Sequence, residues 1–495
     1  MHKTTFFSTE YNKYMFSFNK KYILLSHPVF EYLFNSDQDK KNDLDNQLNT
    51  LTKERNINRE IYSNSEYDYY KRKYEMLKKA DYFLEKNCDS FVDGLISHQD
   101  INFELCNLRA LVFEVTERCN LSCAYCFYGD HYKQYEERHD KDFNIEDAKI
   151  VLDYMKEKWT SEYNESIGKE IYIGFYGGEP LLNFDFVKEL VNYIKTIQQQ
   201  TKLKFRFNMT TNAVLLDKYM DFLVNNNFSL TISLDGDKKN NCYRTFPNKK
   251  SSFDVVLKNI KALIKTHSAY FKESVMFNAV LHDKNDLIDV QNFTRNKFNK
   301  SIRCTEVNPL LVGNSFLYKG RFFNLDKSED MHCFLESSDA NNYNLFLQNY
   351  SKFHFEDFND LYNYDLIKVF IPTGTCVPFS RRMFINAHGK ILPCETIGHE
   401  FSIGDIVNGE INIDTKSIAD KYNSYFIKIR KRCKTCYKIN FCGQCLLLQI
   451  IKDDGTMKCN KIEHDMHHKL LEQYYSIIEK HPELYLKIWE EIHYV

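Results

Sequence analysis

Short apolar runs alternate with amphipathic helical stretches from residue 111 to residue 307. The apolar runs predict six strands, at residues 111–116, 171–176, 205–211, 230–234, 275–281 and 302–307. The stretches between them predict five helices, at residues 145–158, 184–198, 217–226, 253–265 and 287–298. Repeated βα units require parallel strands with right-handed crossovers, so a doubly wound sheet and a barrel are the available α/β architectures. In both, ligands bind at the carboxyl ends of the strands.

The first 105 residues follow a different pattern and predict a separate α+β unit. Residues 14–18 and 22–25 predict a β-hairpin, and residues 28–34 predict a helix. Residues 36–75 are polar and charged, which is typical of an exposed helix or a mobile connection, and residues 70–87 are the better helix candidate. A solvated appendage is the alternative interpretation of the whole region.

The alternation fades after residue 311, and residues 376–459 are rich in cysteine, punctuated by glycine and short of long helices. This pattern predicts a unit built around something other than a large apolar core. A final helical stretch is expected from residue 465 to 478 and onward to 494. The expected units are therefore residues 1–105, 106–330, 331–465 and 466–495.

Composition narrows the possible partners and the compartment. The 495 residues carry 66 Lys and Arg against 68 Asp and Glu, so no net field favours binding to nucleic acid or to an anionic membrane. We find no secretory signal and no apolar run of about eighteen residues, so we expect a cytoplasmic protein without a membrane span. In a reducing compartment, clustered cysteines indicate metal or redox chemistry before disulfides.

Three cysteines follow the first predicted strand. Cys119, Cys123 and Cys126 form a C-x3-C-x2-C pattern in an expected loop. Three thiolates can hold three corners of a four-iron cluster and leave one iron open for chemistry. The alternative is a zinc knuckle completed by His131, but zinc sites usually use paired C-x2-C units.

This loop resembles that of the radical S-adenosylmethionine (SAM) enzymes, and a second motif supports the resemblance. Gly177, Gly178, Glu179 and Pro180 end the second strand as that family's GGEP, which in relatives meets the SAM amino group. The resemblance implies a partial (β/α)6 TIM-like barrel. It also implies further SAM contacts near the adenine, carboxylate and ribose, at Tyr125, Asn212, Ser233, Asp235 and Arg244. The stretch before Arg244 lacks the family's usual His-Asp and is one residue shorter.

The resemblance also implies the chemistry. One electron from the reduced cluster splits SAM into methionine and a 5'-deoxyadenosyl radical, which removes a hydrogen atom from the substrate. The cofactor supplies the difficult step, while the protein orients the substrate and keeps the cavity dry. The implied partners are a substrate and an external electron donor of the flavodoxin or ferredoxin type.

Seven more cysteines lie near the C-terminus. In chain order they are Cys376, Cys394, Cys433, Cys436, Cys442, Cys445 and Cys459. Their spacing fits almost two four-iron clusters or up to two zinc sites, and spacing alone does not choose the metal. The pattern resembles the SPASM extension of radical SAM proteins, except that the last C-x2-C interval usually has three residues.

Residue by residue, this second resemblance implies two auxiliary clusters in a C-terminal iron–sulfur (SPASM) domain. Cys376, Cys394 and Cys445 would hold the first. The second would be held by Cys433, Cys436, Cys442 and Cys459. With the SAM-binding cluster, the chain would carry three [4Fe-4S] clusters.

Proteins with this extension mostly act on peptides, and two subclasses compete. In anaerobic sulfatase-maturating enzymes, which form formylglycine, an Asp base follows the cysteine at the position of Cys394, and here Glu395 stands there. The N-terminal region instead resembles a leader-peptide recognition element, which binds its peptide as an added strand. We therefore expect a maturase of ribosomally made precursor peptides that installs a thioether or carbon–carbon cross-link.

Two alternatives from other classes are less compatible with the sequence. A non-catalytic iron–sulfur binding partner would be expected to lose the three-cysteine loop or the GGEP motif, and both are present. A radical SAM RNA methylase would be expected to show a basic patch, which the balanced charge disfavours.

Overall fold

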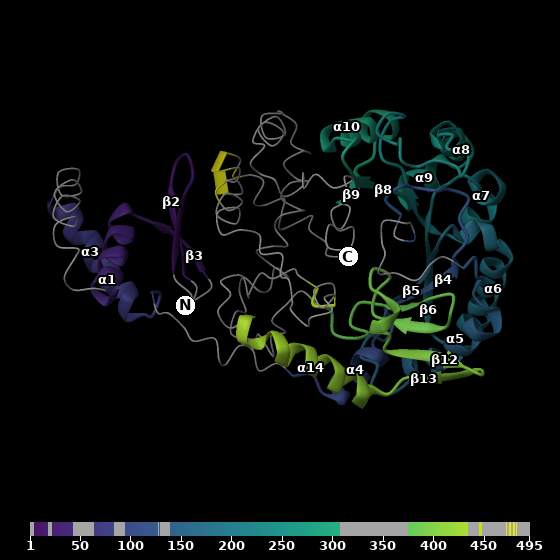
Figure 1. The fold of residues 1–495 in the computed structure, drawn as a ribbon, viewed down its shortest axis with the longest axis horizontal. Coiled ribbons are helices and arrows are strands. Elements are labelled where there is room, and N and C mark those ends of the chain that lie inside the picture. The colour runs from purple at the N-terminus through teal and green to yellow at the C-terminus, as the bar shows by residue number, and fades with distance from the viewer. Residues whose placement is uncertain are drawn as a thin grey trace.

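The structure is a computed structural model (Figure 1). It describes residues 4–17, 22–42, 64–83, 95–126, 128, 139–306, 375–433, 445–447, 472, 475, 476, 479, 480 and 482. Among these residues, no helix is long and apolar enough to cross a bilayer. The boundary expected between residues 330 and 331 and most of the helix expected after residue 465 lie outside the described residues.

Six parallel strands form the centre of a ten-stranded sheet. They are β4 (Ala110–Thr116), β5 (Glu170–Gly177), β6 (Lys204–Thr211), β7 (Ser229–Ser233), β8 (Val275–Leu281) and β9 (Ile302–Glu306). Each pairs in parallel with the next one along the chain. This sequential order differs from a doubly wound sheet, in which the strand order reverses at one point. All six strand predictions are confirmed, with ends within one residue.

Helices connect these strands and lie along the outer side of the sheet (Figure 1). They are α5 (Ile145–Trp159), the short η2 (Pro180–Asn183), α6 (Phe184–Gln200), α7 (Leu216–Asn225), α8 (Phe253–Thr266), α9 (Ser268–Ser274) and α10 (Leu287–Phe298). The five predicted helices are confirmed. Each has an apolar stripe at helical spacing, which is the pattern that predicted it. In α6, Val187, Leu190, Val191 and Ile194 are fully buried in the main core.

Four short strands extend this sheet beyond β4. β10 (Met383–Ile385) pairs in parallel with β4, and β11 (Lys390–Leu392), β12 (Gly404–Val407) and β13 (Glu410–Asn412) follow as antiparallel neighbours. The short η5 (His399–Phe401) lies between β11 and β12. The cysteine-rich region is therefore joined to the parallel strands by main-chain hydrogen bonds.

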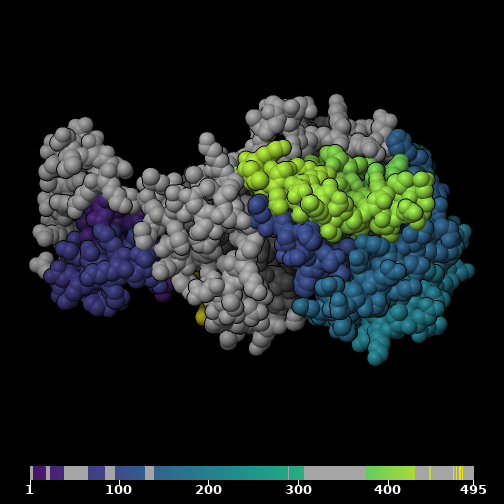
Figure 2. Space-filling model, turned by 90° about the horizontal axis from the view of Figure 1, so that it is seen from below, coloured from purple at the N-terminus to yellow at the C-terminus, as the bar shows by residue number. Residues whose placement is uncertain are grey.

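The expectation that residues 376–459 lack long helices is wrong, because α14 (Thr415–Cys433) spans 19 residues. Its polar composition hides a buried stripe at helical spacing, formed by Ile418, Ala419, Tyr422, Phe426 and Ile429. This stripe contributes to the main core, and α14 packs against α4 (His98–Cys106). Figure 2 shows residues 375–433 lying directly along the α4 and α5 region.

The N-terminal unit has its own sheet and core. β1 (Thr5–Ser8), β2 (Lys13–Ser17) and β3 (Tyr22–Ser26) are antiparallel, and α1 (Pro28–Asn42) packs against α3 (Asn64–Lys79). The predicted hairpin and first helix are confirmed. The helix expected from residue 70 begins six residues earlier and ends at Lys79. α4 crosses the boundary expected after residue 105 and packs into the main core through Ile101 and Leu105.

A C-terminal segment lies against this N-terminal sheet. The ring of Tyr475 lies 4.7 Å from that of Tyr14 and 5.6 Å from that of Phe7. Glu479 accepts hydrogen bonds from the Tyr14 hydroxyl at 2.6 Å and from the Asn12 amide at 2.8 Å. Residues from the two ends of the chain thus share one small aromatic cluster.

Candidate functional site

The three-cysteine loop follows β4 at the carboxyl edge of the parallel strands and is pinned by main-chain hydrogen bonds. Ser122 N donates to Thr245 O at 2.7 Å, and Cys126 N donates to Cys123 O at 3.0 Å. Burial raises the pKa of the Cys123 thiol to about 12, Arg244 opposes that rise, and Cys126 and Cys119 add to it. The three predicted cysteines are therefore brought together in one place.

The GGEP turn packs directly beneath this loop, and its two glycines are required by close contacts. Gly177 has φ +125°, and a Cβ there would lie 2.4 Å from Thr116 O. A Cβ on Gly178 would lie 2.1 Å from Arg118 O. Gly178 N donates to Thr116 O and Glu179 N to Arg118 O, both at 2.8 Å. Only glycine lets the main chain approach the base of the cysteine loop this closely.

Glu179 is fully buried and joins the turn after β5 to the end of β6. Its carboxylate accepts hydrogen bonds from Thr211 Oγ1 and Asn212 N, each at 2.7 Å, and from Leu181 N at 3.2 Å. Burial raises the pKa of Glu179 to about 7, although these hydrogen bonds lower it. The side-chain amide of Asn212 donates to Asn120 Oδ1 at 2.7 Å and lies 3.8 Å from Cys119 Sγ.

Tyr125, Asp235 and Arg244 form a buried network beside the loop. Arg244 Nη2 donates to Asp235 Oδ1 at 3.1 Å, and Arg244 Nε lies 3.0 Å from Asp235 Oδ2. The Tyr125 hydroxyl donates to Asp235, and the Arg244 guanidinium lies 5.4 Å from the Tyr125 ring. The sequence assigned all three residues to SAM, and the structure places them in contact with one another.

A further side chain, that of His282, contacts this network. His282 stacks on Tyr125 with ring centres 5.6 Å apart, and burial lowers the pKa of His282. Sequence reasoning missed His282, although its position directly after β8 was a usable signal. Ser233 ends β7 half-buried and pairs with Asn278.

Three of the C-terminal cysteines lie near one buried residue, Tyr422. Burial raises the pKa of Tyr422 well above its usual value, and Cys445, Cys376 and Cys394 raise it further. These are the three cysteines that the sequence grouped together. Cys433 ends α14, while Cys436, Cys442 and Cys459 lie outside the described residues, so the second group is not placed.

Tyr176 lies near members of both cysteine groups. Burial raises its pKa, and Glu395, Cys126 and Cys394 raise it further. Glu395 follows Cys394, and both its oxygens accept from Arg382 Nη1, at 2.7 and 2.9 Å. The candidate base therefore lies beside the C-terminal cysteines in an ion pair.

The thiol groups fit iron–sulfur clusters, in which each thiolate binds a different iron atom. Within the part of the chain that the structure describes, no three His, Cys, Asp or Glu side chains converge on a point suitable for one metal ion.

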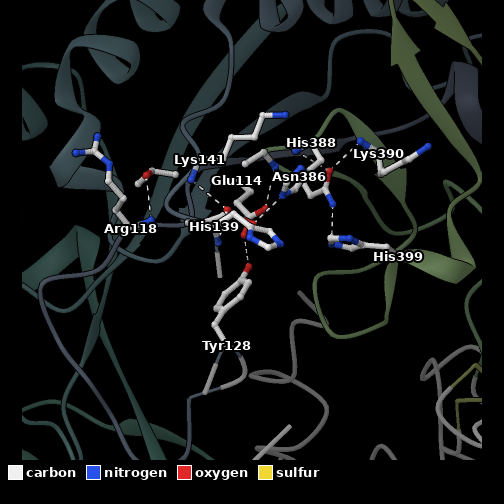
Figure 3. A network of polar contacts seen from close by, with 12 residues as sticks. Glu114, Arg118, Tyr128, His139, Lys141, Asn386, His388, Lys390 and His399 are labelled. Carbon is white, nitrogen blue, oxygen red and sulfur yellow. Dashed lines mark hydrogen bonds and ion pairs between the residues drawn. The ribbon is translucent and has the colours of Figure 1, made fainter. Parts of the chain in front are cut away.

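A polar network that sequence reasoning missed joins β4 to the hairpin between β10 and β11 (Figure 3). Its centre is formed by Glu114 and Glu117, both buried. One signal was available, because Glu114 is a charged residue inside an otherwise apolar strand. Its contacts come from positions far along the chain and were not predictable from local pattern.

Comparison with known families supports the interpretation of the core. The model of the Radical SAM superfamily matches residues 113–294. A cysteine-type anaerobic sulfatase-maturating enzyme of Clostridium novyi is 25% identical over 336 residues, which cover 65% of this chain and 81% of that protein. The radical SAM cyclopropyl synthase TigE of Paramaledivibacter caminithermalis is 28% identical over 226 residues, which cover 44% of each chain.

Solved structures agree at the level of the fold. The structure titled "Native anSMEcpe with bound AdoMet" has a TM-score of 0.51 at 18% identity and covers 77% of this chain and 100% of its own. The one titled "Native anSMEcpe with bound AdoMet and Cp18Cys peptide" has a TM-score of 0.52 at 19% identity, with 76% and 99% covered. The chain therefore carries a radical SAM domain over residues 113–294, and anaerobic sulfatase-maturating enzymes are among its homologues.

Proposed function

We propose that this protein is a radical SAM peptide maturase that removes hydrogen from a ribosomally made precursor peptide and installs a thioether or carbon–carbon cross-link. The observation that carries the proposal is the three-cysteine loop seated on the GGEP turn at the carboxyl edge of parallel strands. The radical SAM family implies a [4Fe-4S] cluster and SAM at this place. When bound, they supply a 5'-deoxyadenosyl radical.

The residues of the chain would hold and orient these groups. Cys119, Cys123 and Cys126 would bind three irons. The Gly177–Gly178 main chain would face the SAM amino group, while Asn212 and Ser233 stand at strand ends suited to its carboxylate and ribose. Burial beside these strand ends would exclude water from the reacting atoms.

Asp235 and Arg244 would act on SAM mainly through Tyr125. Because the carboxylate and guanidinium already neutralise each other, neither is a free charge for SAM. Their contacts fix the Tyr125 ring, which the resemblance places beside adenine.

The C-terminal cysteines would hold two auxiliary clusters. Cys376, Cys394 and Cys445 come together around Tyr422 and suit the first. Cys433, Cys436, Cys442 and Cys459 would hold the second, for a total of three. Glu395 would accept a substrate proton beside Cys394, with Arg382 orienting its carboxylate.

A peptide substrate is supported by the N-terminal unit and by the relatives. β1 and β3 are the outer strands of a three-stranded sheet, and such strands can accept a peptide as an added strand. One solved structure of similar fold contains a Cp18Cys peptide by its title. An external donor of the flavodoxin or ferredoxin type would supply the electron.

A second candidate is anaerobic sulfatase maturation, with formylglycine as the product. The alignment with the Clostridium novyi enzyme favours this candidate, because it covers 81% of that protein. Glu395 at the position of that class's Asp base agrees with it.

The first experiment measures iron and sulfide per chain after anaerobic reconstitution, and 5'-deoxyadenosine formed from SAM and dithionite. We expect about twelve irons with SAM cleavage, four for each cluster. The variant with Ala at Cys119, Cys123 and Cys126 should keep about eight irons and lose cleavage. Cleavage retained in this variant, or absent from the native protein with full clusters, contradicts the proposal.

A second experiment separates the two candidates. Deleting residues 1–94 removes the N-terminal unit but keeps α4, whose Ile101 and Leu105 belong to the main core. The deletion should weaken binding of a labelled peptide encoded beside the gene, measured by fluorescence anisotropy, while peptide-free SAM cleavage persists. Unchanged affinity rules against a recognition unit. Formylglycine formed on a sulfatase-motif peptide instead supports the second candidate.

A further inference from the structure

A buried carboxylate continues the contact between β4 and β10 beyond the point where their strand pairing ends. The paired residues stop at Phe113 and Ile385. One position later on β4, Glu114 Oε2 accepts a hydrogen bond from Ala387 N at 2.9 Å. Its other oxygen accepts from the hydroxyl of Tyr128, two residues after Cys126 (Figure 3). Glu114 thus contacts both the segment that follows the cysteine loop and the β10–β11 hairpin.

Three residues further on, Glu117 makes a second connection to the same hairpin. Its Oε1 lies 2.9 Å from His388 Nε2, and its Oε2 accepts from His139 N at 3.0 Å and Lys141 N at 3.1 Å. Burial would raise the pKa of Glu117, but these hydrogen bonds lower it overall.

The hairpin itself is held in one shape. Asn386 Oδ1 accepts from His388 N at 3.1 Å and from Lys390 N at 2.8 Å, and Asn386 Nδ2 lies 2.7 Å from His399 Nε2. This turn leads through β11 to Cys394, which lies two residues after that strand ends.

Two acidic groups buried this close together carry a large desolvation cost, which apolar side chains would avoid. Burial raises the pKa of Glu114, and nearby Glu117 adds to that rise. Hydrogen-bond donors on the segment that follows the cysteine loop and on the β10–β11 hairpin offset this desolvation cost. Those segments lead to the two cysteine groups, and Tyr176 interacts with Cys126 of one group and Cys394 of the other.

We propose that Glu114 and Glu117 are positioning residues that fix the β10–β11 hairpin, and with it Cys394, relative to the Cys119–Cys126 loop. This inference rests on the proposed function, because the alignment matters if a peptide radical formed at the first site gives one electron to the auxiliary iron–sulfur cluster that Cys376, Cys394 and Cys445 would hold. Loss of the alignment separates SAM cleavage from peptide modification.

The test uses full-length Glu114→Gln. Glutamine keeps one acceptor oxygen, so either the Tyr128 hydroxyl or Ala387 N loses its acceptor. Hydrogen exchange of residues 383–392 should rise about tenfold. The ratio of 5'-deoxyadenosine formed to peptide modified should rise several-fold, while peptide-free SAM cleavage stays at the native rate.

The control is Asp142→Asn in the same network. Asp142 accepts from Thr116 and Arg118 and has no contact with the hairpin among the hydrogen bonds of the described residues. It should change neither readout. If Glu114→Gln does not fold, the same two readouts are measured for Glu117→Gln, which alters the contact with His388 on the same hairpin.

The outcomes separate this inference from the proposed function. An unchanged ratio in both glutamate variants overturns the inference alone. A parallel loss of cleavage and modification also overturns it, because that is what a merely structural role produces. A native protein that forms no 5'-deoxyadenosine overturns the proposed function and the coupling role together.

Discussion

Glu179 accepts three hydrogen bonds in a place that water does not reach, and its ionisation is therefore linked to folding. Its pKa is about 7 in the folded protein, against an ordinary value of 4.5. A carboxyl with a raised pKa binds its proton more tightly when folded. Its contribution to stability is therefore complete below about pH 4.5 and is lost as the pH rises through about 7.

We predict that Glu179→Gln removes this dependence. Between about pH 5 and pH 8 the native protein should lose on the order of 3 kcal/mol of stability relative to the variant. Thermal unfolding of the cluster-free proteins across this range measures the difference. Glu189→Gln, on the exposed face of α6, is the control and should follow the native curve. Parallel curves for native protein and Glu179→Gln would contradict the assignment.

At the scale of residues, short motifs could be predicted from the sequence, whereas the contacts between distant residues could not. The cysteine loop was located by its spacing, and the two glycines by their resemblance to the family's GGEP motif. Asp235 and Arg244 were both expected at SAM, yet they form an ion pair with each other. The choice of partner depends on packing around Tyr125, which no local pattern records.

At the scale of elements, periodicity predicted the long helices and the central strands, because each buries a stripe or a face in the main core. The sequence pattern missed β1 and the strands from β10 to β13, since three or four residues hold too little of the period-two signal. α14 was missed because its buried positions are diluted by charged residues. Its central Tyr422 is 1% exposed and lies among three cysteines.

We predict opposite outcomes for two substitutions of Tyr422. Its hydroxyl is buried with no hydrogen-bond partner among the described residues, so Tyr422→Phe should be neutral or slightly stabilising. Tyr422→Ala should cost about 3 to 5 kcal/mol, because it leaves a cavity between α14 and the sheet. Urea unfolding of cluster-free protein compares them. A large loss in Tyr422→Phe would mean that the hydroxyl is bonded.

At the scale of the whole molecule, contacts between distant parts of the chain define the arrangement. The N-terminal unit and the helices α6 and α7 lie at opposite ends (Figure 1). Tyr475 and Glu479 hold the N-terminal sheet through Phe7, Tyr14 and Asn12. If a peptide binds to that sheet, this contact would fix where the peptide is presented.

We predict that Tyr475→Ala loosens the N-terminal unit without unfolding the core. Amide exchange in β1 and β2 should rise, because removal of a packed aromatic ring exposes Phe7 and Tyr14. Exchange in β4 to β8 should not change. Lys480→Ala, which removes only an exposed ion pair with Glu10, is the control. Equal protection of β1 and β2 in native protein and Tyr475→Ala would mean that the segment does not hold the sheet.

The pairing of β4 with β10 has a consequence for synthesis on the ribosome. β5 covers one edge of β4 soon after it is made, but the contact of Glu114 with Ala387 joins positions 273 residues apart. The other edge of β4 therefore stays unpaired while more than half of the chain is translated. Tyr14 lacks its hydrogen-bond partner Glu479, which lies 465 residues away, for longer still. Nascent chains of this protein expose an open strand edge and an aromatic face, and we expect chaperones to engage them there.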